Sequence, residues 1–478
     1  MSTPRRIAYL TSGAAGMFCG SCLNDNALAR ELLAMGHDVQ LVPLYTPIRT
    51  DTPDMSEGQV FFGGINVYLQ QRTSVFRWLP RWLDRWIDQP WIINLATKLG
   101  GKLDYQKLGG LAVSMLRGEQ GFQSKEVHRL VDWLAGDAQP EIVIFSNVLT
   151  AGCVPELKQR LPVKVFVILQ GDDIFLREMK PADLQLALAE IRRLAGHIDA
   201  FLAHSLFYAD AMAEFLGIDR GKIHVLPLGL HGQEFVPSGE EPIETEQRPP
   251  TIGYLARLAP EKGLHILADA WTRLRRMRGT EQARLKIAGW MGAQNREYAN
   301  SIFRAFDKLG LQGEYEYLGE VDRAGKLALL RSIDVLSVPT TYQEPKGLFV
   351  LESLAAGVPV VQPAHGAFPE VLEELGGGLL HHPEDSQHLA QRLHELLTNS
   401  GLRKELGERG QAAVLNGRTN RIAAEALLRI VEAIDPSASE EKLPRRVSEG
   451  EAAIDEVYVE TAAGPSPQPS PRSTEERE

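Results

Sequence analysis

Two glutamates, Glu344 and Glu352, are separated by seven residues in the stretch Tyr342-Gln-Glu-Pro-Lys-Gly-Leu-Phe-Val-Leu-Glu352. Glu344 follows a predicted strand, and residues 347–356 form a predicted helix that ends at Gly357. Glu352 stands among apolar residues of that helix, where an ionised carboxylate is unfavourable unless it has a partner. Solvent, a nearby arginine or the paired hydroxyls of a ribose could fill that role. We favour the ribose, because acidic residues bind ribose in other nucleotide folds.

A second charged segment is Gly253-Tyr-Leu-Ala-Arg-Leu-Ala-Pro-Glu-Lys-Gly263, which begins in a predicted strand. Arg257 and Lys262 would each be ordinary surface charges in isolation. They follow the carboxyl end of a strand, which is where open α/β sheets bind ligands, and this position favours a binding role.

The loop Ser12-Gly-Ala-Ala-Gly-Met-Phe-Cys-Gly-Ser-Cys22 follows the first predicted strand. Gly13 and Gly16 lack a Cβ and are therefore candidates for close approach of the backbone to a ligand. The full Gly-x-Gly-x-x-Gly pattern is missing, and no acidic residue ends the second predicted strand. The sequence therefore disfavours a dehydrogenase.

Alternating strands and helices must position these loops. The predicted strands are residues 7–11, 39–44, 142–145, 163–169, 200–203, 223–226, 251–255, 285–288, 315–318, 335–338 and 358–362. Helical patterns lie between them, which predicts two doubly wound α/β domains with a cleft between them.

The domain boundaries follow from composition and length. A chain of 478 residues exceeds what one hydrophobic core supports. We expect domains at residues 1–235 and 251–435, joined by a linker rich in Pro and Glu at 236–250. The last helix, about residues 420–435, could pack back on the first domain. Residues 436–478 are rich in Pro, Ser and Glu, and we expect this tail to be disordered.

Charge and apolar patterning exclude several classes of protein. The net charge of -11 argues against binding to a nucleic-acid backbone. Three cysteines give no disulfide framework, and no apolar run reaches the length of a membrane helix. These features predict a cytoplasmic protein.

In its glutamate pair the chain resembles glycosyltransferase family 4, whose GT-B members carry a Glu-Pro-x-Gly-Leu-x-x-x-Glu segment. The resemblance covers nearly all of residues 5–435 and is strongest over 251–374. It implies the GT-B fold, with two Rossmann-like domains facing a cleft, and a nucleotide-sugar donor. It also implies that Glu344 contacts the donor sugar and that Glu352 contacts the ribose.

The resemblance also assigns sites for anions. Arg257 and Lys262 match a Gly-Arg-Leu-x-x-x-Lys-Gly segment that clamps the donor diphosphate in the family. The backbone N–H groups of Gly347, Leu348 and Phe349 would meet the donor near its diphosphate, at a helix N-terminus.

On the other side of the cleft, the family places the loop that holds Gly13 and Gly16 near the donor phosphates and the acceptor. Many members carry a His-Asp pair beside the transferred sugar, where this chain reads Gln170-Gly-Asp-Asp173. Asp172 or Asp173 could contact the sugar or the acceptor, but either could equally be a turn-forming residue.

Two further segments depart from the family pattern. Leu228-Gly-Leu-His231 replaces a usual Asn-Gly-Val-Asp, and Ala288-Gly-Trp-Met-Gly292 replaces a Gly-Asp-Gly-rich turn on the base side of the donor pocket. The donor base therefore stays open.

Two other motifs have ordinary explanations. Cys19 and Cys22 form Cys-x-x-Cys without a second ligand pair, so they are interpreted as small loop residues rather than half of a zinc site. Trp78, Trp82 and Trp86 recur at helical spacing beside arginines. They favour packing or a cleft wall over contact with a lipid-linked acceptor or the membrane surface.

The motifs and the resemblance predict a glycosyltransferase that uses a nucleotide-sugar donor and needs neither a metal nor a cofactor. The resemblance implies that transfer retains the anomeric configuration. Its acceptor is a carbohydrate, lipid-linked or small molecule that the sequence does not identify. A nucleotide-sugar-binding protein without activity and a GT-B sugar-nucleotide epimerase are the alternatives.

Overall fold

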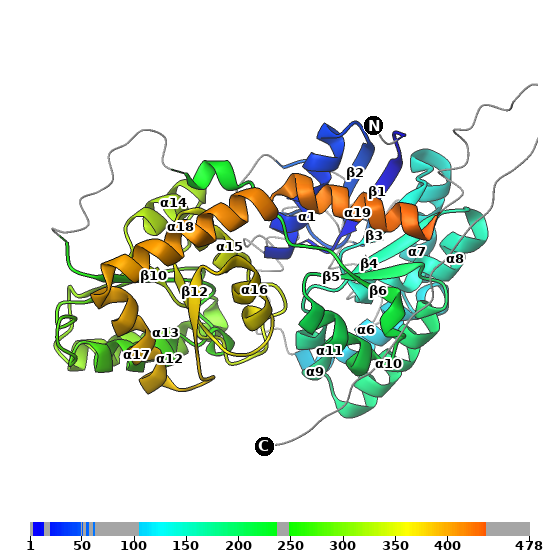
Figure 1. Cartoon of the computed structure of the whole chain (residues 1–478). Helices are drawn as coiled ribbons and strands as arrows, with labels where there is room; N and C mark the ends of the chain where they lie inside the picture. Colours follow the sequence, from blue (N-terminus) through cyan, green and yellow to red (C-terminus); the bar gives the residue numbers. More distant parts are fainter. Residues whose placement is uncertain are drawn as a thin grey trace, which may run out of the picture. The chain divides into compact units, whose positions relative to one another are not determined.

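The computed structural model describes residues 3–13, 20–48, 50, 54–56, 61–62, 105–236 and 248–435. All described elements belong to one compact unit, Met1–Asp435 (Figure 1). Most of the expected linker, all of the expected tail and the segment with Trp78, Trp82 and Trp86 lie outside the described residues.

The N-terminal half is built on six parallel strands in the order β2-β1-β3-β4-β5-β6. Nearly all side chains of the inner strands are buried, as expected for a parallel sheet covered on both faces. The strands are β1 (Arg6–Thr11), β2 (Asp38–Pro43), β3 (Ile142–Phe145), β4 (Lys164–Ile168), β5 (Ala200–Ala203) and β6 (Ile223–Val225). The helices are α1 (Gly20–Ala34), α6 (Tyr105–Leu116), α7 (Ser124–Trp133), α8 (Val154–Arg160), α9 (Asp172–Arg177), α10 (Pro181–Ala195) and α11 (Leu206–Leu216).

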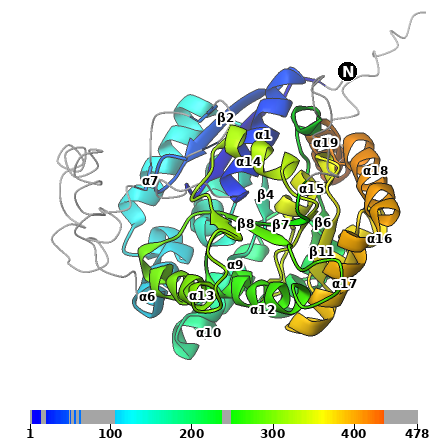
Figure 2. The ribbon, with the colours of Figure 1, turned by 90° about the vertical axis from the view of Figure 1, so that its left-hand side faces the viewer.

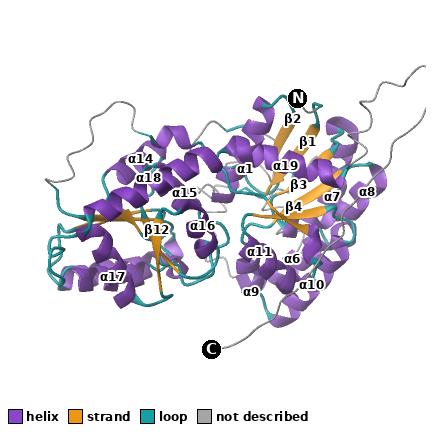
Figure 3. Ribbon diagram, viewed as in Figure 1, coloured by secondary structure: helices purple, strands orange, loops and turns teal. Residues whose placement is uncertain are grey.

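The C-terminal half repeats this architecture, with helices on both sides of a parallel sheet ordered β12-β11-β10-β7-β8-β9 (Figure 3). Its strands are β7 (Thr251–Leu255), β8 (Arg284–Ala288), β9 (Tyr315–Tyr317), β10 (Val335–Leu336), β11 (Val360–Pro363) and β12 (Gly378–His381). Its helices are α12 (Leu264–Leu274), α13 (Arg296–Lys308), α14 (Arg323–Arg331), α15 (Leu348–Ala355), α16 (Phe368–Leu375), α17 (Ser386–Thr398) and α18 (Ser400–Gly417).

Local sequence signals set the ends of the helices that border the candidate site. Ser205 caps α11 by accepting the N–H of Tyr208 at 3.1 Å, and Gly217 ends the helix in the left-handed region. Gly347 precedes α15 with a φ of 66°, a conformation that glycine adopts without strain.

The last described helix, α19 (Asn420–Ile434), belongs to the N-terminal half by its packing, although it follows the second sheet in sequence. Its buried face joins the hydrophobic cluster that contains Tyr9 and Leu32, and it lies beside α1 (Figures 1 and 2). Between α18 and α19 the returning chain bonds to Leu230, whose N–H donates to the carbonyl of Arg418 at 2.8 Å.

The expected fold is confirmed: two doubly wound parallel sheets, each with helices on both faces. Strand β12 was not predicted. It follows Gly376 and Gly377 and spans only Gly378–His381, so its apolar signal is too short to stand out. No helix among the described residues is long and apolar enough to cross a membrane.

Candidate active site

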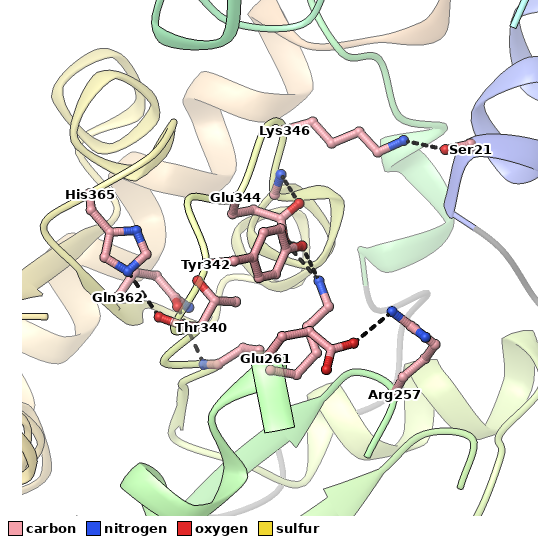
Figure 4. Close-up of polar contacts among 12 residues, drawn as sticks. Ser21, Arg257, Glu261, Thr340, Tyr342, Glu344, Lys346, Gln362 and His365 are labelled. Carbon is pink, nitrogen blue, oxygen red and sulfur yellow. Dashed lines mark hydrogen bonds and ion pairs between the residues drawn. The ribbon is translucent and has the colours of Figure 1, made fainter. Parts of the chain in front are cut away.

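The carboxyl ends of β7 and β10 bring a lysine and a glutamate together. Lys262 follows β7, and its Nζ donates to Glu344 Oε2 at 2.8 Å and to the Tyr342 hydroxyl at 2.5 Å (Figure 4). Tyr342 also donates to the same carboxylate. Neighbouring strands of a parallel sheet end at one edge, which is why residues more than 80 positions apart meet here.

Glu344 is ionised in this setting. Burial by itself raises the pKa of Glu344, but the Lys262 ammonium and hydrogen bonds from Lys262, Tyr342 and the Gly347 N–H bring it below its usual value. Burial and the same carboxylate raise the pKa of Tyr342 well above its usual value, so the phenol remains a neutral donor. The cluster thus combines a cation, a carboxylate and a hydroxyl.

The backbone around Glu344 is fixed by the loop after β11. The N–H of Ala367 donates to the Glu344 carbonyl at 2.9 Å. His365 Nε2 lies 2.9 Å from the Thr340 carbonyl (Figure 4). A Cβ at Gly366 would lie 2.6 Å from the Glu344 nitrogen, so only glycine fits this contact.

The backbone of the loop that carries Arg257 and Lys262 is held by Tyr254. The Tyr254 hydroxyl donates to the carbonyls of Arg257 and Lys262 at 3.1 and 3.3 Å. The guanidinium of Arg257 pairs with Glu261 at 3.0 Å and is 39% exposed, so it remains open to an anion from solution. At Gly263, a Cβ would lie 1.7 Å from the Pro339 carbonyl oxygen.

The partner of Glu352 in this structure is a lysine. Lys326 of α14 places its Nζ 2.6 Å from Glu352 Oε1, and both side chains are nearly buried. Glu352 also lines a pocket of about 160 Å³ together with Leu348, Arg323 and residues of α1. The acid is therefore paired, and it still borders space that a ligand can enter.

The start of α15 lies beside this cluster. The N–H of Gly347 donates to Glu344 Oε1 at 3.3 Å, and Leu348 lines the Glu352 pocket. Phe349 is buried and its ring lies 5.9 Å from Lys262 Nζ. The three residues expected at the donor diphosphate thus adjoin the two glutamates.

Among the glycines of the first loop, Gly13 is described and Gly16 is not. Gly13 has a φ of 81°, and a Cβ there would lie 1.9 Å from the Thr46 carbonyl oxygen. Glycine is thus required at this position by the close contact with Thr46. Cys22 is buried and unoxidised, and Cys19 lies outside the described residues.

The two aspartates after β4 contact other parts of the protein. Asp172 is 1% exposed and accepts the N–H groups of Val148 and Gln170, each at 2.8 Å. Asp173 accepts the hydroxyl of Tyr208 at 2.6 Å. Asp172 therefore fixes the turn, and of the two side chains that of Asp173 is the more exposed.

Sequence reasoning missed a buried acid on α1. Asp25 is fully buried and accepts hydrogen bonds from Tyr9 (2.9 Å), Thr11 (2.7 Å) and Gln170 (3.0 Å). The signal was present: Asn24, Asp25 and Asn26 are consecutive polar residues in a helix, and all three are buried.

Within the described ranges, one group of side chains has the composition of a metal site. His382, Asp385 and His388, at the end of β12 and the start of α17, offer ligand atoms within 4.8 Å of one another. Nδ1 of His388 already accepts the N–H of His382 at 3.0 Å, which places the ring proton on Nε2 and leaves neither nitrogen ready to bind a metal. The group shares no residue with the Glu344 cluster.

Two family models together match most of the chain. Glycosyl transferases group 1 matches residues 240–413, and the glycosyl transferase 4-like domain matches residues 26–229. The phosphatidyl-myo-inositol mannosyltransferase of Mycobacterium leprae is 33% identical over 190 residues, or 40% of this chain and 48% of that protein. The D-inositol 3-phosphate glycosyltransferase of Corynebacterium jeikeium is 26% identical over 224 residues, or 45% and 52%. The chain spans about half the length of the curated relatives that it matches.

Solved structures show the same fold. Anabaena HepE in complex with UDP and glucose aligns over 90% of this chain and 100% of its own, with a TM-score of 0.62 and 16% identity. Sucrose-phosphate synthase from Thermosynechococcus elongatus aligns over 91% and 100%, with a TM-score of 0.66 and 16% identity. With its two sheets and its paired glutamates, this chain belongs to the group 1, family 4 glycosyltransferases and has the GT-B fold.

Proposed function

We propose that this chain transfers a sugar from a nucleoside-diphosphate sugar to a hydroxyl group of an acceptor. The observation that carries the proposal is the contact of Lys262 with Glu344 where β7 and β10 end, with Arg257 on the same loop. Two cations beside an ionised carboxylate suit a substrate that joins an anionic diphosphate to a sugar rich in hydroxyls.

Each side chain has a distinct part in this proposal. Arg257 and Lys262 offset the negative charge that develops on the departing diphosphate, helped by the N–H groups at the start of α15. Glu344 accepts hydrogen bonds from hydroxyls of the transferred sugar. Glu352 receives the ribose in the pocket that it lines, with the oxygen that Lys326 does not hold.

The acceptor would meet the donor from the N-terminal half, where Gly13 follows β1 and Asp173 lies in the first turn of α9, after β4. In the transfer step, the bond from the anomeric carbon to the diphosphate oxygen breaks, and a bond from that carbon to the acceptor oxygen forms. The acceptor proton passes to the departing diphosphate on the same face, so the anomeric configuration is retained. No metal is required, because the diphosphate charge is met by protein groups.

The donor nucleotide is proposed to be UDP, on the ground that HepE, which has the same fold, was crystallised with UDP and with UDP-glucose. At 16% and 15% identity this selects the first probe for the experiment and does not select the sugar. Several curated relatives carry names of inositol-directed transferases, which makes polyols reasonable first acceptors.

The test is a thermal-shift screen of the full chain with UDP, GDP, ADP and their sugars. A ligand at about 100 times its dissociation constant adds about 2.7 kcal/mol to the free energy of unfolding, which is readily seen as a rise in Tm. We expect a rise with one nucleotide class, and no rise in the double variant Arg257→Ala/Lys262→Ala. If no nucleotide raises the Tm of the parent chain, the proposal is wrong.

Turnover then separates the proposed reaction from its alternatives. Release of nucleoside diphosphate that depends on an added acceptor identifies a transferase. Conversion of the donor sugar without an acceptor would identify an epimerase. Tight binding without any turnover, across a broad panel of acceptors, would favour a binding protein.

A further inference from the structure

Lys346 connects the two halves of the chain at the candidate site. It belongs to the same loop as Glu344, two positions further on. Its Nζ donates to the Ser21 hydroxyl of α1 at 2.9 Å (Figure 4). It also donates to Gln170 Oε1, after β4, at 3.0 Å. A cation from the C-terminal half is therefore bound by two residues of the N-terminal half.

The Gln170 side chain also bonds to a buried acid, Asp25. Its carbonyl oxygen accepts from Lys346, and its Nε2 donates to Asp25 Oδ1 at 3.0 Å. The amide can satisfy both neighbours in only one orientation, because the oxygen must face the ammonium and the nitrogen must face the carboxylate. Lys346 and Asp25 are thus linked by an oriented dipole rather than by direct contact.

The two ends of this link, Asp25 and Lys346, carry opposite charges. Asp25 faces Tyr9 and Thr11 of β1 and Gln170, with Lys346 beyond it. Burial raises the pKa of Asp25 to about 6, and the hydrogen bonds and Lys346 act in the opposite direction. The neighbouring imidazole of His204 is neutral, since burial and then Lys346 lower its pKa to about 3. At neutral pH Asp25 is therefore the anion at one end of the link and Lys346 the cation at the other.

A second set of contacts between the halves provides an independent probe. The Glu370 carboxylate of α16 accepts the N–H groups of Leu206 and Phe207, in the first turn of α11, at 2.8 and 3.0 Å. Ser205 donates to the Pro345 carbonyl at 2.9 Å. These two amides lose their acceptor whenever the halves separate.

We propose that Asp25 and Gln170 are positioning residues that hold the Lys346 ammonium, and that this link keeps the N-terminal half against the loop that carries Glu344. A buried acid without a direct cationic partner is unfavourable for stability, which is consistent with a role in function. The consequence for catalysis rests on the proposed function: transfer requires the two halves together, whereas the side chains proposed to hold the nucleotide diphosphate and ribose, Arg257, Lys262 and Glu352, all belong to the C-terminal half.

The test of the link needs no substrate. Hydrogen exchange of the full chain is followed in peptides that contain Leu206 and Phe207. We expect exchange at these amides to be faster by about tenfold in Lys346→Met and in Asp25→Asn, because the opening that exposes them becomes more favourable. The double variant should exchange no faster than the faster single variant, since both changes break one link.

Two control variants set the upper and lower limits of the expected change in hydrogen exchange. Glu370→Ala removes the acceptor itself and should give the largest increase. Lys404→Met, on the exposed face of α18, should leave exchange unchanged. Peptides from β4 should exchange alike in all variants, which excludes general unfolding. Exchange at Leu206 and Phe207 equal to the parent in both Lys346→Met and Asp25→Asn would overturn the proposal.

The kinetic consequence is tested separately with UDP and UDP-glucose. In Lys346→Met, calorimetry should give a Kd for UDP within threefold of the parent, while kcat falls at least tenfold, as expected for loss of a group that positions the reacting parts. A weakened Kd with unchanged kcat would instead make Lys346 a donor-binding residue and refute the positioning role. Absence of nucleotide binding in the parent would contradict the proposed function and leave the exchange result unaffected.

Discussion

Lys326 Nζ lies 2.6 Å from Glu352 Oε1, and the two side chains are only 11% and 6% exposed. Glu352, which the sequence predicts to bind ribose, is therefore also bound by Lys326. Removing one member of a buried pair leaves the other charge without a partner, which commonly costs about 3 to 5 kcal/mol.

This pairing makes the role of Glu352 testable apart from its effect on stability. Glu352→Gln should lower both the Tm and the affinity for nucleoside diphosphate. In the double variant Lys326→Met/Glu352→Gln the buried lysine charge is removed as well, so the Tm should recover while nucleotide affinity stays low. Recovery of nucleotide affinity in the double variant, measured by calorimetry, would exclude Glu352 from ribose binding.

Glu344 should matter for turnover more than for nucleotide binding. We expect Glu344→Ala to lower kcat and to leave the Kd for nucleoside diphosphate within a few fold, because its proposed partner is the sugar. The assignment fails if Glu344→Ala abolishes nucleoside diphosphate binding while Glu352→Gln leaves it intact.

Arg257→Ala and Lys262→Ala should each lower turnover by about a hundredfold, the usual effect of deleting one preorganised group that stabilises developing charge. Both should also weaken binding of the donor. Steady-state kinetics at saturating donor separates the two effects. Turnover within threefold of the parent in both variants would remove these residues from the site.

The raised pKa of Asp25 predicts that the free energy of unfolding depends on pH. Its pKa is raised to about 6 in the folded chain from 3.8, so the folded state holds this proton more tightly than the unfolded state. The contribution of Asp25 to the free energy of unfolding therefore decreases as the pH rises from about 4 to about 6. Since each pKa unit corresponds to about 1.4 kcal/mol, the decrease is roughly 3 kcal/mol. Urea titrations of the parent and Asp25→Asn at both ends of this range measure it. A stability difference that does not change with pH would contradict it.

Transfer should continue in excess EDTA and should retain the anomeric configuration. Arg257, Lys262 and the start of α15 supply the positive charge for which a metal would otherwise be needed. The measurement is the anomeric proton coupling of the product by NMR, in reactions with and without chelator. Activity that is lost with EDTA and restored by Mg²⁺, or an inverted product, would refute this mechanism.

The sequence predicted those parts of the fold and of the site that depend on local order. Lys262 and Glu344 could be placed together because each follows a predicted strand, and parallel strands end at one edge of a sheet. Lys326 could not be assigned to Glu352, because their contact depends on how α14 and α15 pack, which neither segment encodes alone. The same holds for Asp25 and Gln170, which are 145 positions apart.

Tyr254 gives the cationic loop a thermodynamic advantage. By donating to the carbonyls of both Arg257 and Lys262, its hydroxyl holds the backbone of that loop in the free chain. Ordering a mobile side chain on binding typically costs about 0.5 to 1.5 kcal/mol, and ordering backbone adds to this. A loop that is already rigid avoids the backbone share of that entropy loss. An arriving diphosphate therefore does not have to order the backbone of this loop, and more of its attraction for the two side chains appears as affinity.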